Sequence, residues 1–357
     1  MSTVTIVDAW NGPGARDAEL TVVRPADHGL HTHADAGLGR RAFEHWYIDA
    51  RLDSGHTVVG FLTKRRPEES TRATPSIEII VYAPDGSKRQ VNASFPHDAC
   101  SFSRDDLAVR IGPNTAHVDR TGDRPVLHVH LAADGVALDL AFHCEIDAWM
   151  PGRGETHYGP SDHFGWVVAA PRATVTGTLT LDGVVLEARG IGYSDHNWGS
   201  GDMRRIIERW HWGRLYLDDY SMLFANVLTQ KRLGHHRSQP VMLARGSEIV
   251  LSSGEVEITE GPMVFHPGAD REHPRWVQLE VPGQVTLRLD VDRVIDAQDL
   301  LAEVPVVRTR LLKPLIRLLV GRPGYFRFDS TFTLTVHEPD GVVTRTGRTL
   351  HEMVALH

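Results

Sequence analysis

Apolar and polar residues alternate with a period of two along much of this 357-residue chain. The alternation is clearest in the segments 126–131, 136–146, 173–193 and 330–350. A period of two places apolar side chains on one face of a β-strand. The dipeptides Asp182-Gly183 and Asp340-Gly341 interrupt two of these segments and favour the positive φ angles of tight hairpins. The sequence therefore predicts an all-β fold of antiparallel strands.

Helical periodicity is convincing in one segment, residues 306–321. Its leucines and Ile316 form an apolar stripe beside several basic residues. Pro314 would end or kink a long helix, so we expect a short helix near 308–320. Such a helix would cap a β-barrel. The alternative is a basic amphipathic segment that makes transient contact with a membrane surface through 308–320.

The length of the chain predicts two domains rather than one. We place their boundary between residues 198 and 208, which gives domains of 1–200 and 201–357. Each part has enough predicted strands to form a β-barrel or β-sandwich.

Charge and composition narrow the classes of partner. The formal net charge is −8, so no basic field would attract nucleic acid. The N-terminus lacks the pattern of a signal peptide, and no apolar run reaches 18 residues. The two cysteines, Cys100 and Cys144, follow no metal-site or redox spacing. We expect a cytoplasmic protein.

The segment GIGYSDHNWGSG, residues 190–201, combines several side chains that can carry chemistry. On a continuous strand, Tyr193, Asp195 and Asn197 share one face, while His196 and Trp198 share the other. Apolar and aromatic neighbours would raise the pKa of Asp195 and make it a candidate proton donor near neutral pH. Alternatively, Tyr193 and Asp195 are a hydrogen-bonded pair that fixes the end of a strand.

Aromatic residues gather around this segment in the sequence. Trp166 precedes the segment and Trp198 lies within it. Trp210, Trp212 and Tyr216 follow on one face of a predicted strand. Such enrichment indicates an aromatic-lined cavity, whose ring faces would suit a substrate that becomes cationic. Glu44 is a weaker candidate for lining the cavity.

Three motifs carry a resemblance to a known family. GIGYSDHNWG, DHFGWVVAAPRATVTGTL before it and RWHWGRL after it resemble the signature of the acyclic carotenoid hydratases, also called hydroxyneurosporene synthases. The wider superfamily includes lipocalin-like fungal Diels–Alderases, and FEHWYIDARLDSGHTVVGFL at 43–62 resembles its opening strands. The resemblance implies two consecutive lipocalin-like β-barrels or sandwiches with a site near their junction.

The resemblance also implies roles for individual residues. Asp195 would protonate an isoprenoid double bond, and water would capture the tertiary cation. Tyr193 and His196 would tune or reload the acid. A joint role for His163 and Trp166 needs a β-bulge, which we expect at Gly165. Other aromatic and polar residues would shield the cation or line the site: Trp166, Trp198, Trp210, Trp212, Asn197, Tyr216 and Glu44. No cofactor is required, and the sequence has no P-loop or dinucleotide-binding fingerprint.

A histidine cluster offers a metal site as a separate alternative. His128 and His130 lie on one face of a predicted strand, and the next strand could bring His143 and Glu145 beside them. The same residues could equally form a solvated outer face. Our assignment contains no metal.

We therefore expect a cofactor-independent enzyme that hydrates, isomerises or cyclises a hydrophobic small molecule with an alkene or polyene. A non-catalytic lipocalin-like carrier and a pericyclic cyclase of a polyketide are the alternatives. The substrate and the oligomeric state stay open.

Overall fold

The computed structural model describes residues 5–8, 10, 22–33, 38, 41–65, 74–300 and 323–356. Strands make up nearly all of its regular structure, which confirms the expected all-β fold. The chain divides into two compact units. We call them the N-terminal unit, Thr21–Asp202 with Gly246–Ile249, and the C-terminal unit, Met203–Arg245 and Val250–His357 with Met1–Leu20. The domain limits of 1–200 and 201–357 stay a prediction.

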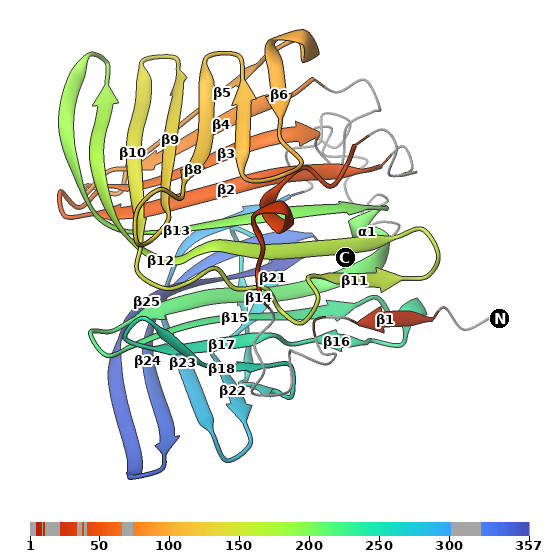
Figure 1. The fold of residues 1–357 in the computed structure, drawn as a ribbon. Coiled ribbons are helices and arrows are strands. Elements are labelled where there is room, and N and C mark those ends of the chain that lie inside the picture. Colours follow the sequence, from red (N-terminus) through yellow and green to blue (C-terminus); the bar gives the residue numbers. More distant parts are fainter. Residues whose placement is uncertain are drawn as a thin grey trace. The chain divides into compact units, whose positions relative to one another are not determined.

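The N-terminal unit is built on one antiparallel sheet with the strand order β5-β4-β3-β2-β13-β12-β10-β9-β8-β7-β6, and β11 pairs with β12 (Figure 1). Its strands are β2 (Phe43–Leu52), β3 (Thr57–Arg65), β4 (Ser76–Tyr82), β5 (Lys88–Ser94), β6 (Cys100–Phe102), β7 (Ala108–Ile111), β8 (Asn114–Asp119), β9 (Val126–Ala133), β10 (Val136–Cys144), β11 (Glu155–Tyr158), β12 (His163–Leu181) and β13 (Val184–Ser200). Two short 3-10 helices accompany them, η1 (Pro25–His28) and η3 (His97–Ala99).

This sheet curls around its own core. Alternate residues of β2, such as Trp46 and Ile48, pack in a core cluster with Val129 and Leu131 of β9. β3 and β9 are distant in the strand order, yet a Cβ added to Gly60 of β3 would lie 2.6 Å from Leu131 Cδ1. The glycine permits this close approach across the core. A curled antiparallel sheet with a filled interior is the architecture of lipocalin-like proteins.

The long hairpin β12–β13 contains most of the segment 190–201, whose side chains were candidates for chemistry. Its turn consists of Asp182 and Gly183, with φ angles of 49° and 84°. Positive φ at both positions is the requirement of a type I′ hairpin turn, so this prediction is confirmed. The strands predicted at 126–131 and 136–146 are also present, as β9 and β10. β13 then pairs with β2 on its other side.

The C-terminal unit has a second antiparallel sheet, in the order β18-β17-β15-β14-β25-β24-β23-β22-β19, with β16 beside β15 and a separate hairpin β20-β21. Its elements are β1 (Ile6–Asp8), α1 (Met203–Ile206), β14 (Ile207–Tyr216), β15 (Tyr220–Thr229), η4 (Lys231–Leu233), β16 (Arg237–Ser238), β17 (Val241–Arg245), β18 (Glu248–Ser253), β19 (Glu257–Glu260), β20 (Met263–His266), β21 (Arg271–Pro274), β22 (Trp276–Val281), β23 (Val285–Asp299), β24 (Gly324–Glu338) and β25 (Gly341–Ala355). The predicted hairpin at 330–350 corresponds to β24 and β25. Its turn is Pro339-Asp340 and not the expected Asp340-Gly341, because Glu338 pairs with Gly341.

The helix expected near 308–320 lies outside the described residues. Its proposed contact with a membrane surface therefore stays a prediction. Among the residues that the structure describes, no helix has both the length and the apolar character needed to cross a bilayer.

Candidate functional site

Asp195 lies at the centre of a hydrogen-bonded cluster on β13. Its Oδ2 accepts hydrogen bonds from Tyr193 Oη at 2.8 Å and from Trp166 Nε1 at 3.0 Å. Its Oδ1 accepts one from Asn197 Nδ2 at 2.9 Å. The residue is only 6% exposed. Tyr193, Asp195 and Asn197 thus share one face of the strand, as the alternation predicted.

The chemistry of the three donors decides which protonation states this cluster can hold. All three donate hydrogen bonds to Asp195, which satisfies a carboxylate. A phenol and an amide also carry acceptor oxygens, so Tyr193 and Asn197 can rotate to accept a proton from the acid. The indole of Trp166 can only donate. The cluster can therefore hold Asp195 in either state, with a partner for its proton on each of its two oxygens.

A second pair of phenol and carboxyl lies on the adjacent strand. Tyr47 Oη donates to Asp49 Oδ2 at 2.6 Å. In the β13–β2 register, Asp195 is opposite Tyr47 and Tyr193 is opposite Asp49. The rings of Tyr47 and Tyr193 meet edge to face, with centroids 6.1 Å apart. Sequence reasoning missed this pair, although the same phenol-x-acid spacing appears at 47–49 and 193–195.

This polar face is opposite the core of the N-terminal unit. The intervening β2 residues Trp46, Ile48 and Ala50 belong to the core cluster, so Tyr47 and Asp49 point the other way. Asp49 is nevertheless buried. Trp149, which our sequence analysis did not single out, adds a further aromatic side chain because its ring meets that of Trp166 edge to face at 5.3 Å.

His196 does not join Asp195, which corrects its expected role in tuning that acid. Its Nε2 is 2.9 Å from Glu44 Oε1, and both side chains are fully buried. Glu44 also accepts hydrogen bonds from the backbone N–H groups of His31 and Thr32, each at 2.8 Å. Burial alone would raise the pKa of Glu44, but these bonds and the interaction with His196 lower it to about 2. Glu44 is thus an ionised partner of His196 on the opposite face from Asp195.

Trp198 also lies on that opposite face, so the structure does not place it as a shield beside Asp195. Its ring stacks on His31 at 3.7 Å, with an interplanar angle of 3°. Its Nε1 donates to Glu155 Oε1 at 2.5 Å. His31 was missed because the segment 28–33 has the composition of a polar loop, which gives no sign of an aromatic stack.

The expected bulge at Gly165 is wrong. Gly165 pairs regularly with Trp198, and the register of β12 shifts only after Val168, between 168 and 173. His163 and Trp166 therefore point to opposite faces, and His163 is not brought to Asp195. A Cβ on Gly165 would lie 2.1 Å from Trp198 Cε2, so this glycine makes room for the indole.

Trp210, Trp212 and Tyr216 lie on one face of β14 in the C-terminal unit. Their alternation with buried His211, Gly213 and Leu215 confirms the predicted arrangement. The guanidinium of Arg214 lies over the rings of Trp212 and Tyr216, at 5.3 and 5.7 Å from their centroids. Their participation in the same site as Asp195 stays a prediction.

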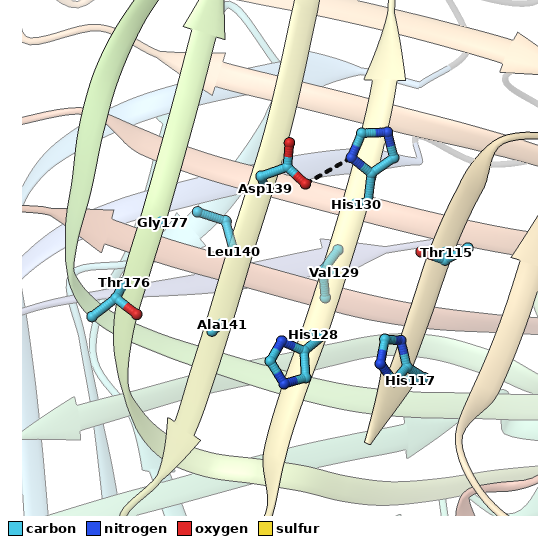
Figure 2. A pocket seen from close by; sticks show the side chains of 10 residues that line it. All are labelled: Thr115, His117, His128, Val129, His130, Asp139, Leu140, Ala141, Thr176 and Gly177. Atoms are coloured by element: carbon cyan, nitrogen blue, oxygen red, sulfur yellow. Dashed lines mark hydrogen bonds and ion pairs between the residues drawn. The ribbon is translucent and has the colours of Figure 1, made fainter. Parts of the chain in front are cut away.

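Two of the histidines weighed as a metal site, His128 and His130, line an open hollow of about 420 Å³ on the outer face of the N-terminal sheet, together with His117 (Figure 2). His130 Nδ1 is 2.8 Å from Asp139 Oδ1, and the rings of His128 and His117 stack at 5.2 Å. His143 turns to Thr176, with Nε2 and Oγ1 3.1 Å apart. Within the described ranges, no three His, Cys, Asp or Glu side chains are placed to hold a metal ion.

Comparison with known proteins places the chain in a family. A family model described as AttH-like matches residues 88–307, which is more than half of the sequence. The chain belongs to the AttH-like family. A hydroxyneurosporene dehydrogenase of Chlorobaculum tepidum is 38% identical over 68 residues, which are 17% of this AttH-like chain and 18% of that protein. The match therefore spans less than a fifth of the relative's length.

Solved structures share the fold of this AttH-like protein over almost its whole length. An AttH protein of Nitrosomonas europaea has a TM-score of 0.58 and 14% identity, with 97% of this chain and 99% of that one covered. Kievitone hydratase of Nectria haematococca has a TM-score of 0.57 and 15% identity, with 97% and 95% covered. CghA, solved with Sch210972, has a TM-score of 0.56 and 14% identity, with 99% and 98% covered. Together with the partial relative, these matches confirm the resemblance to the lipocalin-like carotenoid hydratase family.

Proposed function

We propose that this AttH-like protein is a cofactor-independent enzyme that protonates an alkene in an isoprenoid or polyene-type substrate, with Asp195 as the acid. The buried cluster of Asp195 with Tyr193, Trp166 and Asn197 carries the proposal. The name of kievitone hydratase supports the reaction class, and the name of the hydroxyneurosporene dehydrogenase supports only a polyene-type substrate.

Burial is the first requirement of this chemistry. An alkene carbon is a weak base, so its protonation needs an acid that does not lose its proton to bulk water. Asp195 is almost fully enclosed, and Coulombic effects are stronger where water is excluded. Trp166 holds its indole ring beside the acid through its N–H, and the ring of Trp149 meets it edge to face. Aromatic faces stabilise a cation that forms beside them.

The reaction balances without any other reagent. The acid proton of Asp195 passes to the less substituted alkene carbon, and the electron pair of the double bond forms the new C–H bond. The other carbon becomes a tertiary cation and Asp195 becomes a carboxylate. In hydration, water adds to the cation and its proton returns to Asp195. Loss of a neighbouring C–H proton to Asp195 would instead give an isomer. Attack by a second double bond would give a cyclic cation, which then loses a C–H proton to Asp195 and leaves a neutral ring.

Tyr193 and Asn197 hold the acid during this cycle. Their hydroxyl and amide groups donate to the carboxylate after the proton has left, and they can rotate to accept the proton when it returns. Trp166 donates to the carboxylate throughout, which favours the state that follows proton transfer.

Deuterium incorporation tests the proposal. The protein is incubated in D₂O with a panel of alkenes that includes lycopene and phenols bearing a prenyl chain, and the products are analysed by mass spectrometry. Proton transfer from Asp195 predicts one carbon-bound deuterium for each double bond that reacts. A product without deuterium would indicate a pericyclic cyclase, and binding without any product would indicate a carrier. Either outcome would overturn the proposal.

A further inference from the structure

A second acid, Asp49, lies on the same enclosed face of the sheet as Asp195. β2 and β13 are neighbours in the N-terminal sheet (Figure 1), and residues directly opposite each other in such a pair point to one face. Asp49 is only 1% exposed, although this face is turned away from the core of the unit. We call Tyr47, Asp49, Tyr193 and Asp195 the crossed quartet. All four belong to the N-terminal unit.

Each phenol of the crossed quartet is a neighbour of both acids. Tyr193 donates to Asp195 at 2.8 Å and is directly opposite Asp49. Tyr47 donates to Asp49 at 2.6 Å and is directly opposite Asp195. Side chains in directly opposite positions have Cβ atoms about 4.5–5.5 Å apart. The two acids are therefore connected through a phenol that bonds to one of them and adjoins the other.

Asp49 and Asp195 themselves are diagonal neighbours in this register. Diagonal positions on one face of an antiparallel pair are about 7–8 Å apart, so two carboxyl groups placed there can act on the same small region of a substrate. Inverting glycosidases divide the work between two carboxyl groups in this way, because one gives a proton to the substrate and the other takes a proton from the attacking water. Hydration of an alkene needs the same two operations.

Stability alone does not call for a second acid on this face. A buried tyrosine hydroxyl can be satisfied by a backbone carbonyl or an amide, whereas a buried carboxylate costs free energy because it loses its water. Two carboxylates that share one enclosed place also repel each other. An acid that keeps its proton beside one that has lost it avoids this repulsion, and it is the combination that acid and base catalysis require.

Aromatic rings extend this face onto the next strand. Phe61 of β3 is directly opposite Tyr47, and their rings meet edge to face with centroids 5.0 Å apart. The ring of Tyr193 meets that of Tyr47 on its other side, at 6.1 Å. A row of rings from three adjacent strands thus offers apolar surface to a hydrocarbon chain beside the two acids.

We propose that Asp49 is a second catalytic residue, the base that takes a proton from the water molecule that captures the cation. Tyr47 is its positioning residue. The inference rests on the proposed function and narrows it, because a dedicated base for water selects hydration over isomerisation and cyclisation. The product is then a tertiary alcohol.

The proton balance closes within the crossed quartet. Asp195 gives its proton to the alkene and becomes a carboxylate. A lone pair of the water oxygen forms the C–O bond to the cation, and one O–H bond of that water breaks as its proton moves to the carboxylate of Asp49. Tyr193 then gives its phenol proton to Asp195 and takes the proton held by Asp49. All three groups return to their starting states, and the alkene has gained one water molecule.

The test measures what becomes of the cation in D₂O. The full chain is incubated with lycopene or with 4-prenylphenol, and mass spectrometry and NMR quantify the deuterated tertiary alcohol and the deuterated isomer with a terminal methylene group. Asp49→Asn keeps the shape of the side chain but cannot take the proton of water. We expect the rate of alcohol formation to fall about 10²-fold, the lower end of the contribution of a general base. Deuterium should still enter the isomer, because Asp195 is intact.

Three further variants separate the chemistry from the fold. Asp49→Glu keeps a base and should retain the alcohol as the main product. Tyr47→Phe removes the donor that holds Asp49 and should lower the ratio of alcohol to isomer severalfold, which tests the inference even if Asp49→Asn does not fold. Glu338→Gln is the matched control, since it removes the charge of a tyrosine–carboxylate pair in the C-terminal unit and should leave the ratio unchanged. Thermal unfolding identifies any variant that has lost its fold.

A folded Asp49→Asn variant with the original ratio of alcohol to isomer would overturn the inference. Equal loss of alcohol and of deuterated isomer would also overturn it, because Asp49 would then act only on the acid or on the fold. Deuterated isomer without alcohol from the unmodified protein would overturn the inference and leave the proposed function standing. An absence of deuterated product from the unmodified protein would refute the proposed function and the inference with it.

Discussion

The phenol of Tyr193 donates a hydrogen bond to the carboxyl of Asp195, two residues further along the same strand, with 2.8 Å between Oη and Oδ2. Both side chains are buried on the face of β13 that points away from the core of their unit. A buried phenol with an acidic neighbour is a costly arrangement to maintain unless the two groups satisfy each other. Their pairing gives the acid a partner in both of its protonation states.

Tyr193→Phe removes this donor and keeps the ring. We expect kcat/KM to fall roughly 10- to 100-fold, because a hydrogen bond to a charged group contributes about 1.5–3 kcal/mol. The free energy of unfolding should fall by about 1–2 kcal/mol. Steady-state kinetics and urea unfolding check the two values.

The matched control for Tyr193→Phe is Tyr220→Phe. Tyr220 is also a buried tyrosine that donates to a carboxylate, that of Glu338, but it belongs to the C-terminal unit. Its loss should affect unfolding without changing kcat/KM. Equal loss of activity in the two variants would mean that Tyr193 acts only through stability.

The sequence predicts the strands of this site, and the face on which each side chain lies, better than it predicts the hydrogen-bond partners of those side chains. Period-two alternation and the Asp182-Gly183 turn were enough to place Tyr193, Asp195 and Asn197 together. These are local properties of the backbone. The pairing of His196 with Glu44 joins residues 152 positions apart, and nothing in either local pattern specifies it.

The register of β12 shows a second limit of prediction from the sequence. The sequence contains one glycine and three alanines between 163 and 173, and a bulge at any of them would fit the alternation. The structure places the irregularities after Val168, because Gly165 is already needed to admit the ring of Trp198. Packing across strands decides such positions, and it becomes visible only in three dimensions.

Gly165→Ala should destabilise the protein through that contact. The new methyl group would lie 2.1 Å from the Trp198 ring, so the indole or the backbone must move. We expect a loss of about 2–3 kcal/mol in the free energy of unfolding, as for other overpacked sites. Gly122→Ala is the control, since only Arg124 O at 3.7 Å would lie near its Cβ. A stable Gly165→Ala variant would contradict the described packing of Trp198.

His196→Gln tests whether His196 stabilises the fold through Glu44 and takes no part in the chemistry at Asp195. Loss of the imidazole leaves buried Glu44 with a poorer partner, so the free energy of unfolding should fall by about 2–4 kcal/mol. At a temperature where the variant is folded, kcat should stay within about twofold of the original, the scale of a change without lost transition-state contacts. His130→Gln, which loses an exposed pairing with Asp139, should change neither quantity. A large loss of kcat at unchanged stability would show that His196 takes part in catalysis.

A fall in pH should lower the free energy of unfolding because two buried histidines stay neutral in the folded protein. Burial lowers the pKa of His28 and of His351 to about 3, against 6.5 for an exposed histidine. Between these values the unfolded chain binds a proton on each residue that the folded chain does not bind. The free energy of unfolding therefore falls as the pH drops below 6.5, by up to about 1.4 kcal/mol per pH unit for each histidine.

His351→Gln should make this pH dependence less steep between pH 6.5 and pH 4.5. Below that range, Glu44 and Glu260 add to the loss, because the pKa of each is lowered to about 2 in the folded protein and the unfolded chain takes up protons first. Urea unfolding at half-unit pH steps measures the slope. An identical slope in the variant would show that His351 does not stay neutral in the folded protein.

Turnover by Asp195→Asn tests the central claim most directly. The substitution keeps the shape of the side chain and a hydrogen-bonding partner for Tyr193 and Asn197, but it removes the transferable proton. With any alkene that the unmodified protein converts, we predict that kcat falls by at least about 10³-fold, within the range expected when a general acid is lost, while the dissociation constant changes by less than about threefold. Unchanged kcat with unchanged binding would contradict the account.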